Sequence, residues 1–102
     1  MDNRDGAEIF EYIRRRRHGK VVKVGVVLGL IDEGVIKIGW SKCNIKSDTF
    51  KPLQGIELAK ARARNETPTT TPVPNCIKRQ MRQFCSRAVR YFKGAQRLEI
   101  PA

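Results

Sequence analysis

The fold is predicted most clearly by one stretch of the chain, VVKVGVVLGLIDEGVIKIGWS at residues 21–41. Residues 21–31 are rich in β-branched side chains, and residues 35–41 continue that character after the turn-forming triplet Asp32-Glu33-Gly34. Two such runs separated by a short loop with glycine are typical of an antiparallel hairpin. The stretch therefore predicts a β-hairpin that the rest of the chain must cover.

The register of this hairpin follows from its turn. With Gly34 in the left-handed position of a three-residue loop, Ile31 pairs with Val35. The large apolar side chains then share one face, with Leu30 beside Ile36, Leu28 beside Ile38 and Val26 beside Trp40. The opposite face is flat because it carries Gly25, Gly29 and Gly39. Such glycines either relieve twist and form bulges or let the backbone of a partner approach closely.

Three helices are expected around the hairpin. Residues 7–17 are predicted to form a short helix, with Asp5 as N-cap and with acids preceding arginines, as the helix macrodipole favours. Pro52 suits the first turn of a second helix that runs to about Asn65. The third helix, Asn75 to Lys93, has the strongest amphipathic pattern. Residues 65–74 are rich in Pro and Thr and predict a flexible linker.

These elements predict a single domain, residues 1–102, of the α+β class. Its architecture would be a two-stranded antiparallel hairpin packed on two or three helices in the order α-β-β-α-α. The second helix would bury Leu53, Ile56, Ala59 and Ala63 on one face. A lone hairpin is only marginally stable. Either the helices cover it well, or a second copy of the chain extends the sheet in a homodimer.

The charge is the strongest functional signal. Lys and Arg number 21 against 10 Asp and Glu, which gives a net charge of +11. Small domains usually carry a net charge of about 2 to 8, and excess like charge repels itself in the compact state. The positive charge is concentrated in residues 14–17, which are four arginines, and in residues 76–97, which hold seven basic residues and no acid.

This distribution predicts an anionic partner, most simply nucleic acid, DNA or RNA, whose phosphates Lys and Arg would contact. The candidate nucleic-acid-binding residues are Arg14, Arg15, Arg16, Arg17, Lys78, Arg79, Arg82, Arg87, Arg90 and Lys93. Nearby side chains that could read or stack on bases are Asn75, Gln80, Gln83, Tyr12 and Tyr91.

Catalysis is not predicted, and no metal or cofactor is expected. His18 follows four arginines, whose field disfavours a protonated imidazole. Asp48 and Glu57 could together bind a divalent ion, so a small metal-dependent nuclease stays as an alternative. The cysteines, Cys43, Cys76 and Cys85, have neither the number nor the spacing of a disulfide framework or a zinc site. They are expected to be buried free thiols in a reducing compartment.

A membrane is not expected as a partner. The longest apolar stretch is interrupted by Lys23 and is shorter than the roughly 20 residues that a membrane-spanning helix needs. The acidic, polar residues 1–6 lack the features of a secretory signal. A soluble protein of the cytoplasm is therefore expected.

One part of the chain resembles a recurrent pattern of small uncharacterised bacteriophage proteins, roughly G-x-S-x-C-N-x-x-D-x-F-x-x-x-x-G-x-x-x-A-x-x-R-A. The residues that carry it are Gly39-Trp40-Ser41-Lys42-Cys43-Asn44, Lys46, Asp48-Thr49-Phe50-Lys51, Gly55-Ile56-Glu57-Leu58-Ala59 and Arg62-Ala63-Arg64. The resemblance implies a phage origin and action in the bacterial host cytoplasm, and it implies no catalytic residues.

The same unit has two interpretations in physical terms. As scaffold, Phe50 would fix the following helix to the sheet and Gly55 would let that helix come close. As a site, Lys42, Asn44, Lys46 and Lys51 would form a phosphate-facing loop. The function predicted overall is a non-enzymatic, nucleic-acid-binding accessory protein. The main alternative is a phage inhibitor that binds a host enzyme or defence protein through its basic surface.

Overall fold

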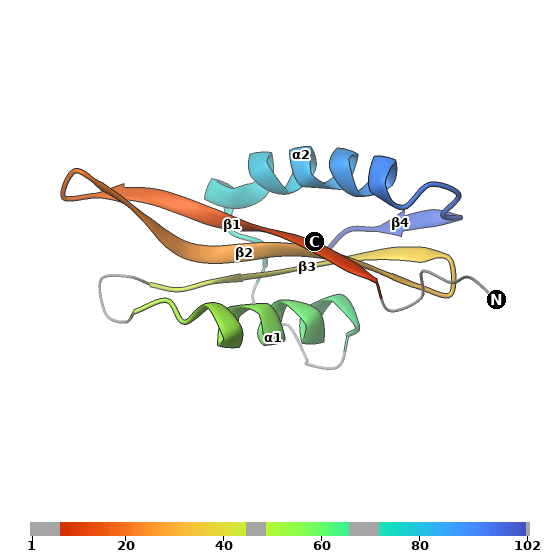
Figure 1. Cartoon of the computed structure of the whole chain (residues 1–102), viewed down its shortest axis with the longest axis horizontal. Coiled ribbons are helices and arrows are strands. Elements are labelled where there is room, and N and C mark those ends of the chain that lie inside the picture. The colour runs from red at the N-terminus through yellow and green to blue at the C-terminus, as the bar shows by residue number, and fades with distance from the viewer. Residues whose placement is uncertain (1–6, 45–48, 66–71, 102) are drawn as a thin grey trace.

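The computed structural model describes residues 7–44, 49–65 and 72–101. Its elements are β1 (Glu8–Arg17), β2 (Lys20–Asp32), β3 (Val35–Lys42), α1 (Pro52–Ala63), α2 (Asn75–Tyr91) and β4 (Arg97–Glu99). They form a four-stranded sheet in the order β1-β2-β3-β4, in which only β4 runs parallel to its neighbour. The helices α1 and α2 cover opposite faces of this sheet (Figure 1).

This architecture corrects the predicted α-β-β-α-α order and the two-stranded hairpin. The class is α+β, but the chain begins with strands and the sheet has four of them. A second copy of the chain was expected because a lone hairpin is only marginally stable. The sheet has four strands, so it does not need a second copy for that reason.

The predicted N-terminal helix is wrong, because residues of that segment form β1. Ile9 and Ile13 are buried, and their spacing of four suits one face of a strand as well as one face of a helix. The strand pairs along its whole length with β2. A two-residue turn joins them, His18-Gly19, with φ of 50° and 76°, the positive values that a type I′ hairpin turn requires. Pairing with β2 therefore outweighs the local charge order that favoured a helix.

The second hairpin is predicted correctly, but its register is wrong by one residue. The turn has two residues, Glu33 and Gly34, with φ of 51° and 79°, so Asp32 pairs with Val35. Ile31 consequently lies opposite Ile36. A shift of one residue moves side chains to the other face of a strand, so the apolar residues of the two strands divide between both faces of the sheet.

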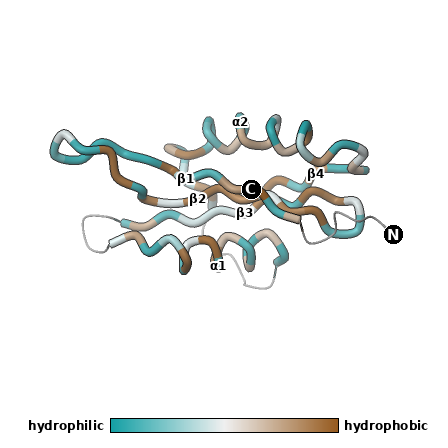
Figure 2. The backbone as a smooth tube through the Cα atoms, viewed as in Figure 1, coloured by the Kyte–Doolittle hydropathy of each residue, from teal (hydrophilic) through white to brown (hydrophobic). Residues whose placement is uncertain are grey.

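Apolar residues recur along the central strands of the sheet (Figure 2), and each face of the sheet has its own core. The larger core lies under α2 and includes Ile9, Ile13, Val27, Ile31, Ile36, Ile38, Trp40, Ile77, Met81, Phe84, Cys85, Ala88 and Phe92. The smaller core lies under α1 and consists of Val26, Leu28, Leu30, Ala59 and Ala63. A sheet buried on both faces explains why β2 is an almost continuous apolar run.

The helix α1 lies very close to the sheet. A Cβ atom at Gly39 would collide with the carbonyl oxygen of Ala59, so this glycine makes room for the chain's own helix and not for a partner. A Cβ atom at Gly55 would lie 2.5 Å from the ring of Phe50, which agrees with the scaffold interpretation of that unit. Leu53, predicted to be buried, is 81% exposed.

The remaining differences concern the ends of elements. The helix α2 ends at Tyr91, two residues before the predicted Lys93. In the predicted linker, residues 66–71 lie outside the described part of the chain, while Val73 is buried in the core under α2.

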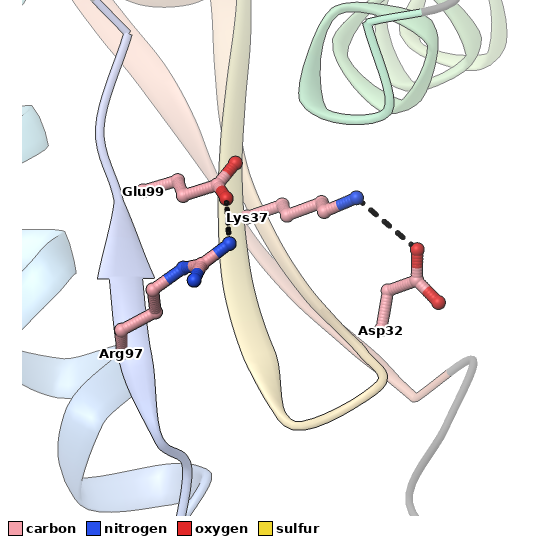
Figure 3. A network of polar contacts seen from close by, with 4 residues as sticks. All are labelled: Asp32, Lys37, Arg97 and Glu99. Carbon is pink, nitrogen blue, oxygen red and sulfur yellow. Dashed lines mark hydrogen bonds and ion pairs between the residues drawn. The ribbon is translucent and has the colours of Figure 1, made fainter.

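The short strand β4 was not predicted. Within β4, Arg97 forms an ion pair with Glu99. A second ion pair, between Lys37 and Asp32, lies at the same end of the sheet (Figure 3).

Candidate nucleic-acid interface

The first candidate surface is an arm formed by residues 14–23 at the tip of the β1–β2 hairpin. The tip projects beyond the ends of both helices (Figure 1), and the molecule is correspondingly elongated, with extents of 47 × 26 × 23 Å. Its paired residues are Arg14 with Lys23, Arg15 with Val22, Arg16 with Val21 and Arg17 with Lys20. Six of these ten residues are cationic and none is acidic.

Both faces of the arm carry positive charge. Residues directly opposite each other in an antiparallel ladder point to the same face. Arg14, Arg16 and Lys23 therefore share one face of the arm, with Val21, which is 61% exposed. The other face carries Arg15, Val22, Arg17 and Lys20.

The base of the arm is anchored to the body of the protein. A shift in register between Ile13 and Arg14 marks the point where the arm begins. Arg15 Nη2 donates to the carbonyl oxygen of Cys76, at the start of α2, at 3.4 Å. On the opposite face, Lys23 Nζ lies 4.2 Å from the centre of the Tyr12 ring, a favourable cation–π distance. These contacts hold the arm as a continuation of the sheet.

The acidic side chains of β1 do not neutralise the arm, because each forms an ion pair with a basic side chain of a helix. Lys60 Nζ of α1 lies 3.0 Å from Glu8 Oε1, and Arg87 Nη1 of α2 lies 3.2 Å from Glu11 Oε2. The next acid after Glu11 is Asp32, at the far end of β2, where it pairs with Lys37. Glu8, Glu11 and Asp32 therefore pair with cations outside the arm.

The second candidate surface is the solvent-facing side of α2. Five of the predicted residues are exposed and form no ion pair among the described residues: Lys78, Arg79, Arg82 and Arg90 on α2, and Lys93 just after its end. Arg87 differs from these five, since it binds Glu11 and its guanidinium lies 6.0 Å from the centre of the Phe84 ring. Its role is to link α2 to β1.

Two of the side chains predicted to read or stack on bases, Gln80 and Tyr12, make contacts within the protein instead. Gln80 Nε2 donates to Glu11 Oε1 at 2.9 Å and to the Tyr12 carbonyl oxygen at 3.2 Å, so its amide is engaged. Tyr12 is half-buried and contacts the Phe50 ring. Asn75, Gln83 and Tyr91 are exposed. Asn75 provides no capping hydrogen bond, and the N-cap of α2 is Pro74.

Two arm cations were missed in the sequence-based prediction, Lys20 and Lys23. Each lies across the ladder from a predicted arginine, Arg17 and Arg14 respectively. The signal that could have found them is the pair His18-Gly19, because recognising a two-residue turn there places the following lysines beside the arginines.

The residues considered for catalysis or metal binding are exposed or lie outside the described part of the chain. Among the described residues, no group of three or more His, Cys, Asp and Glu side chains could hold a metal ion. Glu57 is exposed on α1, and Asp48 lies outside the described residues. His18 is exposed at the tip of the arm. In the described part of the chain, no helix is long and apolar enough to cross a membrane.

The predicted phosphate-facing loop corresponds to a pocket of about 370 Å³ at the end of β3. Lys42, Asn44 and Lys51 line it together with Phe50, while Lys46 lies outside the described residues. The hydroxyl oxygen of Ser41, also at this pocket, is buried with no hydrogen-bond partner in the described structure.

The cysteines occupy three different environments. Cys43 is half-buried, Cys76 is exposed and Cys85 is buried, and all three are free thiols. Burial raises the pKa of the Cys85 thiol. The prediction that all three are buried is therefore wrong for Cys76.

Comparisons of the chain with protein-family models, with curated proteins and with solved structures give no match. A functional proposal therefore has to rest on the charges and geometry described above.

Proposed function

We propose that the protein binds nucleic acid without catalysing a reaction, and that it contacts phosphates through the arm and the exposed side of α2. The observation that carries this proposal is the arm, residues 14–23, a ribbon with six cations, five of them exposed, and no acid. The resemblance to small phage proteins adds the proposal of a phage accessory protein that acts in the bacterial host cytoplasm.

The two surfaces supply enough cations for phosphate binding. Arg17 and Arg87 are left out because they interact with other groups of the chain. Five arm residues, four residues of α2 and Lys93 just after it then give ten cations. Each phosphate contact releases counterions, so the logarithm of affinity for duplex DNA falls with the logarithm of salt concentration at a slope of about −0.9 per contact. If half of these cations engage phosphates, we expect a slope of about −5.

The proposal is tested by fluorescence anisotropy of labelled DNA and RNA across a series of salt concentrations. The arm variant R16Q/K20Q removes two cations. The matched control K37Q/R97Q also removes two, from the opposite end of the sheet, where both are paired with acids. We expect the arm variant to lower the steepness of the salt slope by about 2 and the control to leave it unchanged.

Two results would overturn the proposal. The first is the absence of binding to DNA and RNA at low salt, which together with a host protein recovered on the purified chain would favour an inhibitor. The second is cleavage of the nucleic acid in Mg²⁺ or Mn²⁺, which would favour a nuclease.

A further inference from the structure

We infer that the partner is double-stranded DNA and that the arm enters its major groove. This inference rests on the proposed nucleic-acid binding and adds to it the form of the nucleic acid and the part of the chain that reads it. The arm is an antiparallel two-stranded ribbon, paired from Arg14–Lys23 to Arg17–Lys20.

The arm has the length to fill a groove. A strand rises about 3.3 Å per residue, so the four residue pairs extend about 13 Å from the base of the arm. The major groove of B-form DNA is about 8.5 Å deep. The turn at His18 and Gly19 can thus reach the floor of the groove before the ends of α1 and α2 meet the DNA backbone (Figure 1).

The width of the arm discriminates between nucleic acids. Its strands lie about 4.8 Å apart, and a two-stranded ribbon fits the B-form major groove, which is about 12 Å wide, but not the minor groove of about 6 Å. The major groove of an RNA duplex is deep and narrow, and side chains cannot read it. A single strand offers no groove at all.

The chemistry of the arm matches the two walls and the floor of the groove. Cations lie on both faces of the ribbon, Arg14 and Arg16 on one and Lys20 on the other, so that they would face opposite phosphate backbones of the groove. Arginine also donates two hydrogen bonds to O6 and N7 of guanine. Val21, 61% exposed near the tip, presents methyl groups of the kind that contact the thymine methyl.

The test shortens the arm while keeping its register. Replacing residues 16–21 with an Asn-Gly turn leaves the Arg15–Val22 pair next to a favourable type I′ turn. This change removes three cations: Arg16, Arg17 and Lys20. The matched control R16Q/R17Q/K20Q removes the same three charges at full length. Neither change touches the two cores, and thermal unfolding checks that both variants fold.

The readouts are affinity and footprinting on one sequence, as duplex DNA, duplex RNA and single-stranded DNA. We expect the unmodified protein to prefer duplex DNA by about ten-fold, the size of effect that one specific groove contact gives. It should also protect guanine N7, in the major groove, from dimethyl sulfate. The shortened arm should lose both effects, whereas the full-length control should keep part of the N7 protection.

The outcomes separate this inference from the proposed function. Equal affinity for the three nucleic acids with unprotected guanine N7 would overturn groove entry and leave phosphate binding in place. Equal N7 protection by the shortened and unmodified proteins would also overturn it. The absence of binding to any of the three would overturn both.

Discussion

At the scale of single residues, Gly39 shows how closely the two layers approach. Its missing side chain allows the backbone of α1 to lie directly on β3, at the carbonyl oxygen of Ala59. Arg62 supports the same contact, because its Nη1 donates to the Trp40 carbonyl oxygen at 2.9 Å and its guanidinium stacks 4.2 Å from the centre of the Trp40 ring. Burial lowers the pKa of this guanidinium.

The substitution Gly39→Ala is therefore expected to destabilise the protein by about 2 to 3 kcal/mol, in the upper part of the range for overpacking. The new methyl group would meet backbone atoms, which cannot move aside cheaply. Gly29→Ala is the control, because the three atoms nearest to its methyl group would all belong to side chains, those of Ile38 and Phe84 at 3.2 Å and of Ala88 at 3.6 Å. Urea unfolding of both variants measures the difference, and equal losses would contradict the proposed close approach.

A second prediction at this scale concerns thiol reactivity. Cys76 is exposed and Cys85 is buried with a raised pKa. The thiolate is the reactive form, so a raised pKa lowers its fraction at any pH below that pKa. With a disulfide reagent at pH 8, Cys76 should react rapidly and Cys85 only after unfolding. The Cys76→Ser variant should lose the rapid phase; a rapid phase assigned to Cys85 would contradict its burial.

At the scale of elements, the two tight turns determine how the sheet is assembled. Glu33 and Gly34 are both in the left-handed region, which fixes the β2–β3 register and divides the apolar residues between two cores. The triplet at 32–34 is consistent with both a two-residue and a three-residue loop, and the choice between them decides which residues of β2 and β3 share a face of the sheet. The sequence-based prediction of strand identity was therefore sound for β2 and β3, while the prediction of their faces was not.

The turn itself can be tested. A non-glycine residue in the left-handed region costs about 1 to 2 kcal/mol, and Asn tolerates it better than most. We expect Glu33→Asn to stabilise the protein by about 0.5 kcal/mol and Gly34→Ala to destabilise it by about 1 kcal/mol or more. Thermal unfolding gives both values, and a stabilising Gly34→Ala would contradict the two-residue turn.

The limits of sequence-based prediction also lie at this scale. Pro52 and the amphipathic pattern of residues 75–91 predicted α1 and α2 nearly to their ends, because these signals are local. The strand β1 was missed because Ile9 and Ile13 fit a helix and a strand equally well. The strand β4 was missed because three residues carry too little periodicity. Lys20 and Lys23 of the candidate site were missed with β1, since only its pairing with β2 brings them to the arginines.

At the scale of the whole molecule, two surfaces hold most of the exposed cations, the arm and the outer side of α2. Four acids of the described residues pair with lysine and arginine: Glu8 with Lys60, Glu11 with Arg87, Asp32 with Lys37 and Glu99 with Arg97. The arm and α2 are joined at the contact between Arg15 and the carbonyl oxygen of Cys76. One nucleic acid could therefore contact both surfaces together.

This arrangement predicts that the two surfaces contribute additively to binding. The variant R79Q/R90Q on α2 should lower the steepness of the salt slope by about 2. Combined with R16Q/K20Q on the arm, it should lower it by about 4, since distant sites with no shared partners add. Titration of labelled DNA measures each slope. A combined change no larger than that of the arm variant alone would show that α2 faces solvent in the complex.

The measurement that tests the account most directly is the mapping of backbone amide chemical shifts by NMR while a short DNA duplex is added to the protein. The account predicts that the amides of residues 14–23 shift first and most, followed by those on the exposed side of α2. It would be contradicted by shifts confined to α1 and the pocket at the end of β3, with the amides of the arm unchanged.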